Sequence, residues 1–420
     1  MSHTPGQIRF TVLAGGVGAG RRCRFVTAHG VVETPTFMPV GSDGAVRTLT
    51  PAQVVAAGGP AVVLGNTFHL LLAPGPEVVA QHGGLHRFMG WERSILTDSG
   101  GFQIFSLPGA AVTDSGIRFP DPRKEHAGRE VWLDPEESLR IQGLLGSDIA
   151  MALDECPGYP ATHAQVAAAV ARTSAWAARC CFAHARPGQL LFGIVQGGTF
   201  ADLRRRSIAE ITGLPFDGFA IGGVSVGEGS ELIHQVVAET APQLPVDRPR
   251  YLMGVGLPED ILTAVAAGCD LFDCVIPTRY GRNATLFTRR GKVRIQERRY
   301  RRDLAPVDAE CGCYTCRTFT RSYLHHLFAV AEPLGATLAS LHNLCFYQEL
   351  MAGIRAAIEA DRLQDFSARF LDRYLRGSGR PTGESAAPGS MPVAAAERPT
   401  PGHVKGKNPA PGRGRRGGRG

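Results

Sequence analysis

The sequence predicts an α/β protein, a (β/α)8 barrel with an N-terminal antiparallel cap and a cysteine-rich insertion after the eighth strand. Eight short apolar runs each end in Gly, Asp, Gln or Asn, and helix-like segments separate them. Eight such strand-plus-helix units are typical of a closed parallel barrel. The count alone also fits an open doubly wound sheet, which remains the alternative at this point.

Each element has a local signal. Residues 8–34 alternate and turn like a set of antiparallel hairpins, which predicts the cap. The predicted strands lie at 35–42, 61–68, 94–101, 148–155, 190–198, 218–225, 250–256 and 271–277. One predicted helix starts after Thr50, a typical N-cap, with Pro51 in its first turn, and others lie at 161–185 and 257–268.

The resulting domain organisation has five parts. We expect a cap over 1–34, the barrel over 35–275, an insertion over 276–345 and a C-terminal helix closing the barrel over 346–376. Residues 377–420 are rich in Gly, Pro and Ala and nearly free of large apolar side chains, which predicts a disordered basic tail.

Composition narrows the class of protein. At 420 residues and 44% hydrophobic content, the chain can bury a full core. The N-terminus has no charged lead before an apolar stretch, and no run of 18 apolar residues occurs, so we expect a cytoplasmic protein without a membrane span. Ten scattered cysteines do not form a disulfide framework, and in a reducing compartment a tight cluster is better interpreted as a metal site.

The net charge of +7 is unevenly distributed. The tail holds eight of the 45 basic and two of the 38 acidic residues, leaving 37 and 36 for the first 376 residues. Between Arg279 and Arg302, ten Lys and Arg residues face one Glu. Such a run is usually a solvated surface. Here it adjoins Asp273 and the cysteine cluster, which favours a polyanionic partner.

Carboxylate, amide and hydroxyl side chains, together with glycines and one methionine, follow the predicted strands at the edge where barrel enzymes carry out chemistry. They are Asn66, Asp98, Ser99, Asp154, Glu155, Gln196, Gly222, Gly223, Met253, Gly254 and Asp273. A single polar strand end usually caps the next helix, but a ring of them is typical of a pocket. No His-x-His pair follows the first strand and no Gly-rich phosphate loop with lysine occurs, which argues against a metal-dependent hydrolase or a nucleoside-triphosphate enzyme. Two carboxylates at opposite edges indicate displacement at a sugar carbon, one as nucleophile and one as acid/base.

The segment "CGCYTC" is the sharpest local signal. It supplies Cys311, Cys313 and Cys316, and a fourth ligand is needed to close a tetrahedral zinc site. Three free buried thiols are the alternative at this spacing. Candidates for the fourth ligand are His325, His326 and His342, the last of which opens a predicted helix whose first turn could face the cluster. This pattern predicts a zinc-binding insertion after the eighth strand.

Taken in order, the motifs resemble one family. "TDSGGFQIFSL", "DECPGYPAT", "GFAIGGVSVGE", "YLMGVG", "FDCVIPTR" and "CGCYTCRTFTRSYLHHL" with the later "LHN" are similar to the bacterial tRNA-guanine transglycosylases, from about residue 8 to about 375. The resemblance implies a TIM barrel with one structural zinc per subunit and a homodimer. It also implies exchange of guanine at the wobble position of G-U-N tRNAs for 7-aminomethyl-7-deazaguanine, in queuosine biosynthesis.

The resemblance also assigns roles by motif. It implies that Asp273 attacks the ribose to give a covalent RNA–enzyme intermediate and that Asp98 is the general acid/base. It implies that Asp154 binds the N1 and amino edge of guanine, while Gln196 and the backbone N–H of Gly223 bind O6. Further implied positions are Ser99 and Asn66 in support, Phe102 and Met253 on the two faces of the base, the Val224 carbonyl with Glu228 behind it for the aminomethyl group, Arg279 and Arg282 facing RNA, and Cys311, Cys313, Cys316 and His342 on zinc.

Some residues depart from the family pattern. Phe102 stands where tyrosine is more frequent, Tyr280 is bulkier than expected beside the arginines, and 118–133 matches poorly. Val226 reduces the room for a larger base, which favours the bacterial reaction over that of queuine-using relatives. The alternatives are a relative using another deazaguanine and a non-catalytic, zinc-stapled tRNA-binding subunit, against which three pocket carboxylates argue.

Overall fold

The structure is a computed structural model that describes residues 8–15, 20–105, 107–126 and 128–377. These residues belong to one structural unit, Met1–Pro388. The predicted tail from residue 378 onward and residues 1–7 and 16–19 of the predicted cap lie outside the described residues.

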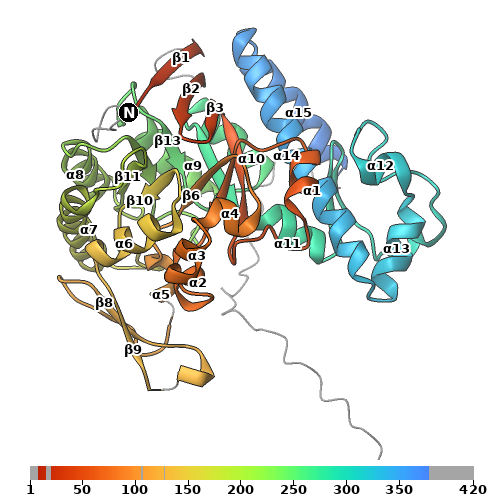
Figure 1. Cartoon of the computed structure of the whole chain (residues 1–420). Helices are drawn as coiled ribbons and strands as arrows, with labels where there is room; N and C mark the ends of the chain where they lie inside the picture. The colour runs from red at the N-terminus through yellow and green to blue at the C-terminus, as the bar shows by residue number, and fades with distance from the viewer. Residues whose placement is uncertain (1–7, 16–19, 106, 127, 378–420) are drawn as a thin grey trace, which may run out of the picture. The chain divides into compact units, whose positions relative to one another are not determined.

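Eight parallel strands close into a barrel in the order β4-β5-β6-β10-β11-β12-β13-β14 (Figure 1). They are β4 (Thr36–Gly41), β5 (Val62–Gly65), β6 (Ser94–Thr97), β10 (Ile149–Met151), β11 (Leu190–Val195), β12 (Gly218–Ile221), β13 (Arg250–Leu252) and β14 (Leu271–Cys274). Pairing of β14 with β4, which places Asp273 beside Met38, closes the ring. The predicted barrel is confirmed and the open sheet is excluded.

Helices alternate with the strands and lie outside them (Figure 1). They are α1 (Pro51–Ala56), α2 (Thr67–Leu72), α3 (Pro76–Gln81), α4 (Leu85–Met89), α5 (Gly101–Ile104), α6 (Pro135–Leu145), α7 (His163–Ala183), α8 (Ala201–Thr212), α9 (Ser230–Thr240), η2 (Ala241–Gln243), α10 (Pro258–Ala266) and α11 (Ile276–Arg282). Thr50 caps α1 as predicted, in a reciprocal capping box with Gln53.

Side-chain alternation along the strands fills the barrel interior. The interior cluster includes Met38, Val62, Leu64, Leu96, Ile149, Met151, Leu190, Phe192, Ile194, Ala220, Tyr251 and Leu271. Because strand side chains alternate between faces, the residue two positions after an interior residue faces the same way. This rule directs Asn66, Asp98, Gln196, Met253 and Asp273 toward the interior at the C-terminal ends of their strands. Phe272 instead joins the cluster between strands and helices.

The N-terminal cap covers the opposite end of the barrel. Strands β1 (Phe10–Gly15), β2 (Arg21–Thr27) and β3 (Gly30–Thr34) form an antiparallel sheet, as predicted. Its side chains contact residues where barrel strands begin: Arg21 pairs with Asp270, Thr27 bonds Ser94 and His29 bonds Asp148. The C-terminal ends, where the polar ring lies, therefore stay clear of the cap.

The sequence left the conformation of residues 103–133 open, and three strands within this range form a second antiparallel sheet. Its elements are β7 (Ala111–Val112), β8 (Ile117–Pro120), η1 (Lys124–His126) and β9 (Glu130–Leu133). Asp121 receives hydrogen bonds from Arg123 and His126 within this sheet. Figure 1 shows β8 and β9 projecting from the barrel beside α2 and α5.

The C-terminal region differs from the prediction in one respect. After β15 (Thr285–Thr288), β16 (Gly291–Arg294), η3 (Arg298–Arg302), α12 (Tyr314–Thr318) and α13 (Arg321–Ala329) come α14 (Pro333–Glu359) and α15 (Leu363–Gly377). The prediction that His342 opens a helix is wrong, because α14 begins at Pro333 with Glu332 as its N-cap. The expected boundary between 345 and 346 consequently falls inside α14. Gln348 of α14 donates to the Phe37 carbonyl, which fixes this helix against β4.

Candidate active site and metal centre

Asp273 lies at the end of β14 and accepts two hydrogen bonds on a single oxygen. The Tyr251 hydroxyl lies 2.5 Å and the Gly254 amide 2.9 Å from Asp273 Oδ1. Burial raises the pKa of the Asp273 carboxyl, and these two donors oppose the rise. Burial and the negative charge of Asp273 raise the pKa of Tyr251 well above its usual value, so its phenol stays a donor. Both donors hold Oδ1, which leaves Oδ2 for contact with a substrate.

Asp98 is held at the end of β6 by neutral donors. The Asn66 amide lies 2.6 Å from Oδ2, the Gln103 amide 3.2 Å from Oδ2 and the Thr67 backbone amide 2.7 Å from Oδ1. Burial raises the pKa of Asp98 to about 7, the charge of Asp273 adds to the rise, and the bonds from Thr67 and Gln103 oppose it. At neutral pH this group therefore exchanges protons readily.

Asn66 has two functions at this position. Its amide nitrogen binds Asp98, while its amide oxygen accepts from the His69 backbone N–H as the N-cap of α2. An aspartate could cap α2 equally well but would place a second negative charge against Asp98. The amide is thus the side chain that satisfies both requirements.

Asp154 follows β10 and faces Ser99 and Gln196. The Gln196 amide nitrogen lies 2.6 Å from Asp154 Oδ2, and the Ser99 hydroxyl lies 3.3 Å from Oδ1. Burial raises the pKa of Asp154 to about 6, against the lowering effect of these donors. The buried Gln196 Oε1 has no hydrogen-bond partner among the described residues, a feature typical of a pocket that receives a polar ligand.

The loop after β12 approaches this cluster closely. Gly223 has φ +65°, and a Cβ there would lie 2.4 Å from Gln196 Oε1, so glycine is required. The buried Arg204 donates to the Gly223, Gly198 and Val195 carbonyls and fixes the loop. The Gly223 backbone also lies within hydrogen-bonding range of the Cys156 thiol, whose pKa burial raises to about 12.

Glu228 orients the peptide bond between Val224 and Ser225. The Ser225 amide lies 2.5 Å from Glu228 Oε1, and the Val226 amide lies 2.9 Å from Oε2. In a trans peptide the C=O points opposite to the N–H. The Val224 carbonyl therefore points away from Glu228. Ser225 itself has φ +62°, which is uncommon for a residue other than glycine and often marks a functional loop.

Phe102 and Met253 lie at the rim of the polar ring. Phe102, on the short helix α5, exposes 49% of its surface. Met253 follows β13 and packs against the interior cluster. Both are available to contact a flat apolar surface.

Three arginines gather close to the Asp273 strand. Arg279 and Arg282 lie on α11, directly after β14. Burial lowers the pKa of Arg282, and the positive charges of Arg47 and Arg279 lower it further. Tyr280 does not project among them, since its ring stacks on the buried Phe287 at 5.6 Å. Sequence reasoning identified Arg279 and Arg282 but missed Arg47, which lies in the loop after β4.

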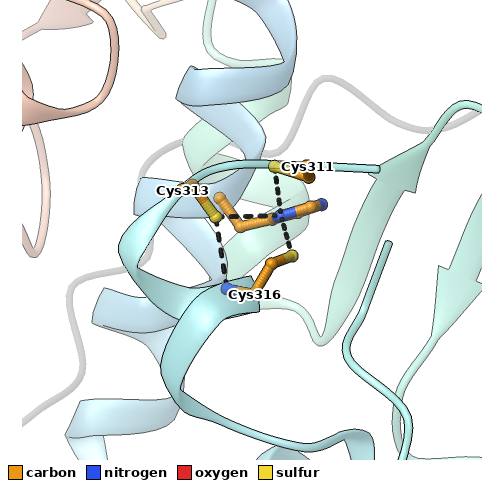
Figure 2. A group of neighbouring side chains, drawn as sticks. Cys311, Cys313 and Cys316 are labelled. Atoms are coloured by element: carbon orange, nitrogen blue, oxygen red, sulfur yellow. Dashed lines mark hydrogen bonds between the residues drawn. The ribbon is translucent and has the colours of Figure 1, made fainter. Parts of the chain in front are cut away.

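The structure gathers all four predicted metal ligands in the C-terminal insertion. His342 Nδ1 lies 3.8, 3.5 and 3.2 Å from the sulfurs of Cys311, Cys313 and Cys316, and all four residues are buried. Figure 2 shows the three labelled cysteines around one centre. The His342 Nε2 lies 2.6 Å from the Phe287 carbonyl, which keeps the proton on Nε2 and leaves Nδ1 free to bind a metal.

The other histidine candidates do not take part. His325 Nδ1 lies 2.8 Å from the Ile295 carbonyl, and neither His325 nor His326 belongs to the cluster. A residue that sequence reasoning missed is Cys345, which lies close to Cys311 and Glu349. Its position three residues after His342 on one helix was the signal that could have identified it, because residues i and i+3 share a helix face.

Comparisons with known proteins identify the family of this chain. The family model described as queuine tRNA-ribosyltransferase matches residues 17–376. The chain belongs to this family. The queuine tRNA-ribosyltransferase of Thiobacillus denitrificans is 53% identical over 354 residues, covering 84% of this chain and 95% of the relative. That of Moorella thermoacetica is 50% identical over 372 residues, covering 88% and 99%. The resemblance inferred from the motifs is confirmed, and the protein is an enzyme of the tRNA-guanine transglycosylase type.

Two further findings concern the tail and the helices. The family match ends at residue 376, so the basic tail is no part of it. Within the described residues, no helix combines the length and the apolar character needed to span a bilayer.

Sequence reasoning missed several residues that hold the polar side chains at the strand ends in place, namely Tyr251, Thr67, Gln103 and Arg204.

Proposed function

We propose that the protein exchanges guanine at the wobble position of G-U-N tRNAs for 7-aminomethyl-7-deazaguanine through a covalent ribosyl-aspartate intermediate, in queuosine biosynthesis. One observation carries this proposal. Two buried carboxylates, Asp98 and Asp273, interact electrostatically at the pocket, and burial raises the pKa of the first to about 7. One can hold a proton while the other is ionised, as displacement at a sugar carbon requires.

The proposed first step uses both groups. Asp273 Oδ2 forms a bond to ribose C1′ while the C1′–N9 bond to guanine breaks and its electron pair stays on the base. Asp98 gives its proton to the departing base, which leaves as neutral guanine. In the second step the incoming base gives a proton to Asp98, its nitrogen bonds C1′, and Asp273 leaves as a carboxylate. Tyr251 and Gly254, bonded to Oδ1, stabilise that carboxylate and keep it oriented.

Base recognition is assigned to the Asp154 cluster. Asp154 would accept from the N1–H and amino group of guanine, while Gln196 Nε2, which has a second N–H, and the Gly223 amide would donate to O6. The Gly223 amide lies near the thiol of Cys156, a weak acceptor, so a carbonyl oxygen would be a better partner. Phe102 and Met253 would stack on the two faces of the base, which offsets the cost of unstacking it from RNA. Ser99 and Asn66 would support Asp154 and Asp98.

The aminomethyl group is assigned to the Val224 carbonyl. The Glu228 carboxylate binds the Ser225 and Val226 amides, and this orientation frees the Val224 carbonyl to accept from an ammonium group. Val226, Gly223 and Glu228 also line a small cavity of about 20 Å³. The branched side chain of Val226 leaves less room here, which supports the smaller deazaguanine over a base that carries a ring on its side arm.

The RNA partner is assigned to the basic face beside β14. Arg279 and Arg282 lie on α11, which follows β14, and Arg47 and Arg279 both repel the charge of Arg282. Repulsion among three cations is relieved when a polyanion binds, so a tRNA backbone fits this position. We also infer that the barrel is catalytic and that the insertion, which begins after β14 and continues into α14, faces RNA. The protein would work in the cytoplasm, where tRNA is modified.

The ion in the Cys3His cluster is proposed to be zinc. Zinc–sulfur and zinc–nitrogen bonds of about 2.3 and 2.0 Å at a tetrahedral angle separate sulfur from nitrogen by about 3.5 Å. The three separations here, 3.8, 3.5 and 3.2 Å, fit that value. The role would be structural, because all four positions are protein ligands. Cys313→Ala should release the metal and lower the thermal stability, whereas unchanged stability with no bound metal would contradict a structural role.

A homodimer is proposed from an exposed apolar surface on the same insertion. Tyr314, Tyr323, Val330 and Leu334 each expose more than a third of their surface, and Phe319 packs between the two tyrosine rings. Exposed aromatic clusters of this kind are enriched at protein interfaces. Analytical ultracentrifugation of the wild type and of Tyr323→Ala tests this assignment, with a shift of the variant toward monomer expected.

The experiment that tests the proposed reaction is base exchange. The protein is incubated with labelled guanine and a tRNA bearing a G-U-N anticodon, alongside the same tRNA with adenine at the wobble position. We expect label in the first tRNA only, and competition by 7-aminomethyl-7-deazaguanine. Binding of tRNA without exchange would instead identify a non-catalytic subunit, and competition by a different deazaguanine would identify a relative with another substrate.

A further inference from the structure

Two histidines and an aspartate meet at the end of the barrel that faces away from the active site. His29 lies in the turn between β2 and β3, His86 lies on α4 and Asp148 directly precedes β10. His29 Nδ1 is 2.7 Å from Asp148 Oδ1, and His86 Nε2 is 3.0 Å from Asp148 Oδ2. One ligand atom from each residue lies within 4.8 Å of the others. Three segments far apart in the chain therefore bring together two imidazoles and one carboxylate.

We propose that His29, His86 and Asp148 form a second divalent metal site, one that accepts Zn²⁺ or a similar first-row ion. Two imidazole nitrogens and a carboxylate oxygen are a donor set that zinc uses in proteins, with water in the fourth position. The two nitrogens contact different oxygens of Asp148, at 2.7 and 3.0 Å, whereas adjacent ligands of one tetrahedral ion lie roughly 3.3 Å apart. Binding of an ion would therefore require the rings and the carboxylate to separate slightly, which the exposure of His29 allows. The ion would replace the protons that now lie between the rings and the carboxylate, and so link all three segments.

The residues around Asp148 hold the two histidines and the carboxylate in a fixed arrangement, which favours a binding site over a chance contact. The Asp148 side chain has no exposed surface, and the Ile95 amide, 2.8 Å from Oδ2, holds its orientation. The rings of His29 and His86 stack at 3.6 Å with an interplanar angle of 15°. This packing turns both nitrogens toward the same carboxylate. The His29 side chain is 38% exposed, which gives an ion a path from solvent and leaves room for a bound water.

The position of the site defines its function. Asp148 precedes β10, so the site lies where strands begin, whereas the catalytic aspartates lie where strands end. A metal there would fix the cap sheet and α4 to the barrel. It should therefore raise the thermal stability of the protein by a few degrees at saturation and leave base exchange unchanged.

The test uses the untagged full-length protein with zinc already in its Cys3His cluster. Co²⁺ is added, and the visible spectrum and the metal content per chain are measured. We expect one further equivalent, with the weak bands of a nitrogen and oxygen site and without the intense sulfur charge-transfer band of a cysteine site. His29→Gln and His86→Gln should each weaken this binding by more than about tenfold, because each removes a ligand.

His163→Gln is the matched control. His163 Nε2 lies 2.8 Å from Asp202 in a single exposed histidine–carboxylate pair without a second histidine, so its loss should not change Co²⁺ binding. The proposal is overturned if Co²⁺ adds no further equivalent. It is also overturned if the equivalent persists in both His29→Gln and His86→Gln, or if its spectrum shows sulfur ligands. His29→Gln replaces a partly exposed side chain, so the variant is expected to fold.

Discussion

The two ends of strand β14 carry aspartates with opposite surroundings. Asp270, just before the strand, receives the Arg21 guanidinium on both oxygens, at 3.0 and 2.5 Å, and the Arg250 amide at 2.8 Å. Asp273, near its other end, receives a phenol and an amide. The first carboxylate has a cation as partner, and the second has only neutral donors. Only two residues, Leu271 and Phe272, thus separate a carboxylate paired with a cation from one that has neutral donors alone.

The same division extends around the barrel. At the strand starts, the imidazoles of His86 and His29, together with the Ile95 amide, lower the pKa of Asp148 in spite of burial. At the strand ends, no ion pair among the described residues involves Asp98, Asp154 or Asp273, and burial raises the pKa of each. Burial also raises the pKa of Asp270 despite the charge of Arg21. The ion pair with Arg21 therefore offsets part of the free-energy cost of burying the Asp270 carboxylate, but not all of it. Buried carboxylates without a cation destabilise a fold, and their shared position at the strand ends supports the proposed function.

The largest effect is expected at Asp98, the proposed general acid. Asp98→Ala should reduce base exchange by about 10²–10⁴-fold, because the base must then depart without a proton. The unfolding free energy should stay the same or rise, since a buried carboxylate with only neutral donors is removed. Exchange kinetics and denaturant unfolding of the same preparation measure both quantities. A variant that unfolded more easily and kept its exchange rate would place Asp98 with the structural carboxylates.

The second prediction concerns the other end of the barrel. Arg21→Leu should lower the unfolding free energy by about 3–5 kcal/mol, because it leaves Asp270 buried without its cation. Arg24→Leu is the control on the same strand. Its partner Glu33 and Arg24 itself are both partly exposed, so that ion pair should contribute less than about 1 kcal/mol. Equal losses in the two variants would show that burial does not determine the strength of these pairs.

The third prediction is a pH dependence of adduct formation. Asp98 must be protonated to act as an acid, and its pKa is about 7, so the rate should fall about tenfold per pH unit above 7. Below neutrality the rate should fall again when Asp273, whose pKa is also raised, takes up a proton. Single-turnover trapping across pH 5–9 gives the profile. The limb above pH 7 should disappear in Asp98→Asn, and its persistence there would assign the titration to another group.

The smallest effect is expected from the tail. Truncation after Gly377, where α15 ends, should leave turnover at saturating tRNA unchanged. The eight basic residues of the tail should strengthen tRNA binding only at low ionic strength, because attraction to phosphates falls steeply with salt. Charge reversal of Arg279 should instead reduce turnover at every salt concentration. Loss of turnover on truncation at moderate salt would place the tail in the catalytic machinery.

The sequence predicted which residues share one end of the barrel because a closed parallel barrel converts strand order into spatial position. Asn66, Asp98, Gln196, Met253 and Asp273 each stand two residues after an interior side chain, so alternation and closure together bring them to one end. No pairwise contact had to be foreseen. The cysteine spacing was informative for a similar reason, since close ligands in the chain remain close in space.

Other contacts depend on packing across long sequence separations, and no local pattern encodes them. Tyr251 reaches Asp273 only because β13 and β14 are neighbours in register. The start of α14 was missed because that helix is buried on most of its surface, so its sequence lacks a polar face that marks its limits. The opposing roles of Asp270 and Asp273 likewise became visible only when Arg21, from the cap, was placed beside one of them.

The most direct test of the account compares these two aspartates in one assay. Asp273→Asn and Asp270→Asn are each mixed with tRNA, and denaturant-stable tRNA adducts are counted per folded molecule, with the unfolding free energy measured on the same samples. We predict no adduct and undiminished stability for Asp273→Asn, since an amide is a poor nucleophile. For Asp270→Asn we predict a loss of about 3 kcal/mol or more, with adducts forming at the wild-type level. An adduct on Asp273→Asn, or a stable Asp270→Asn protein that forms none, would contradict the account.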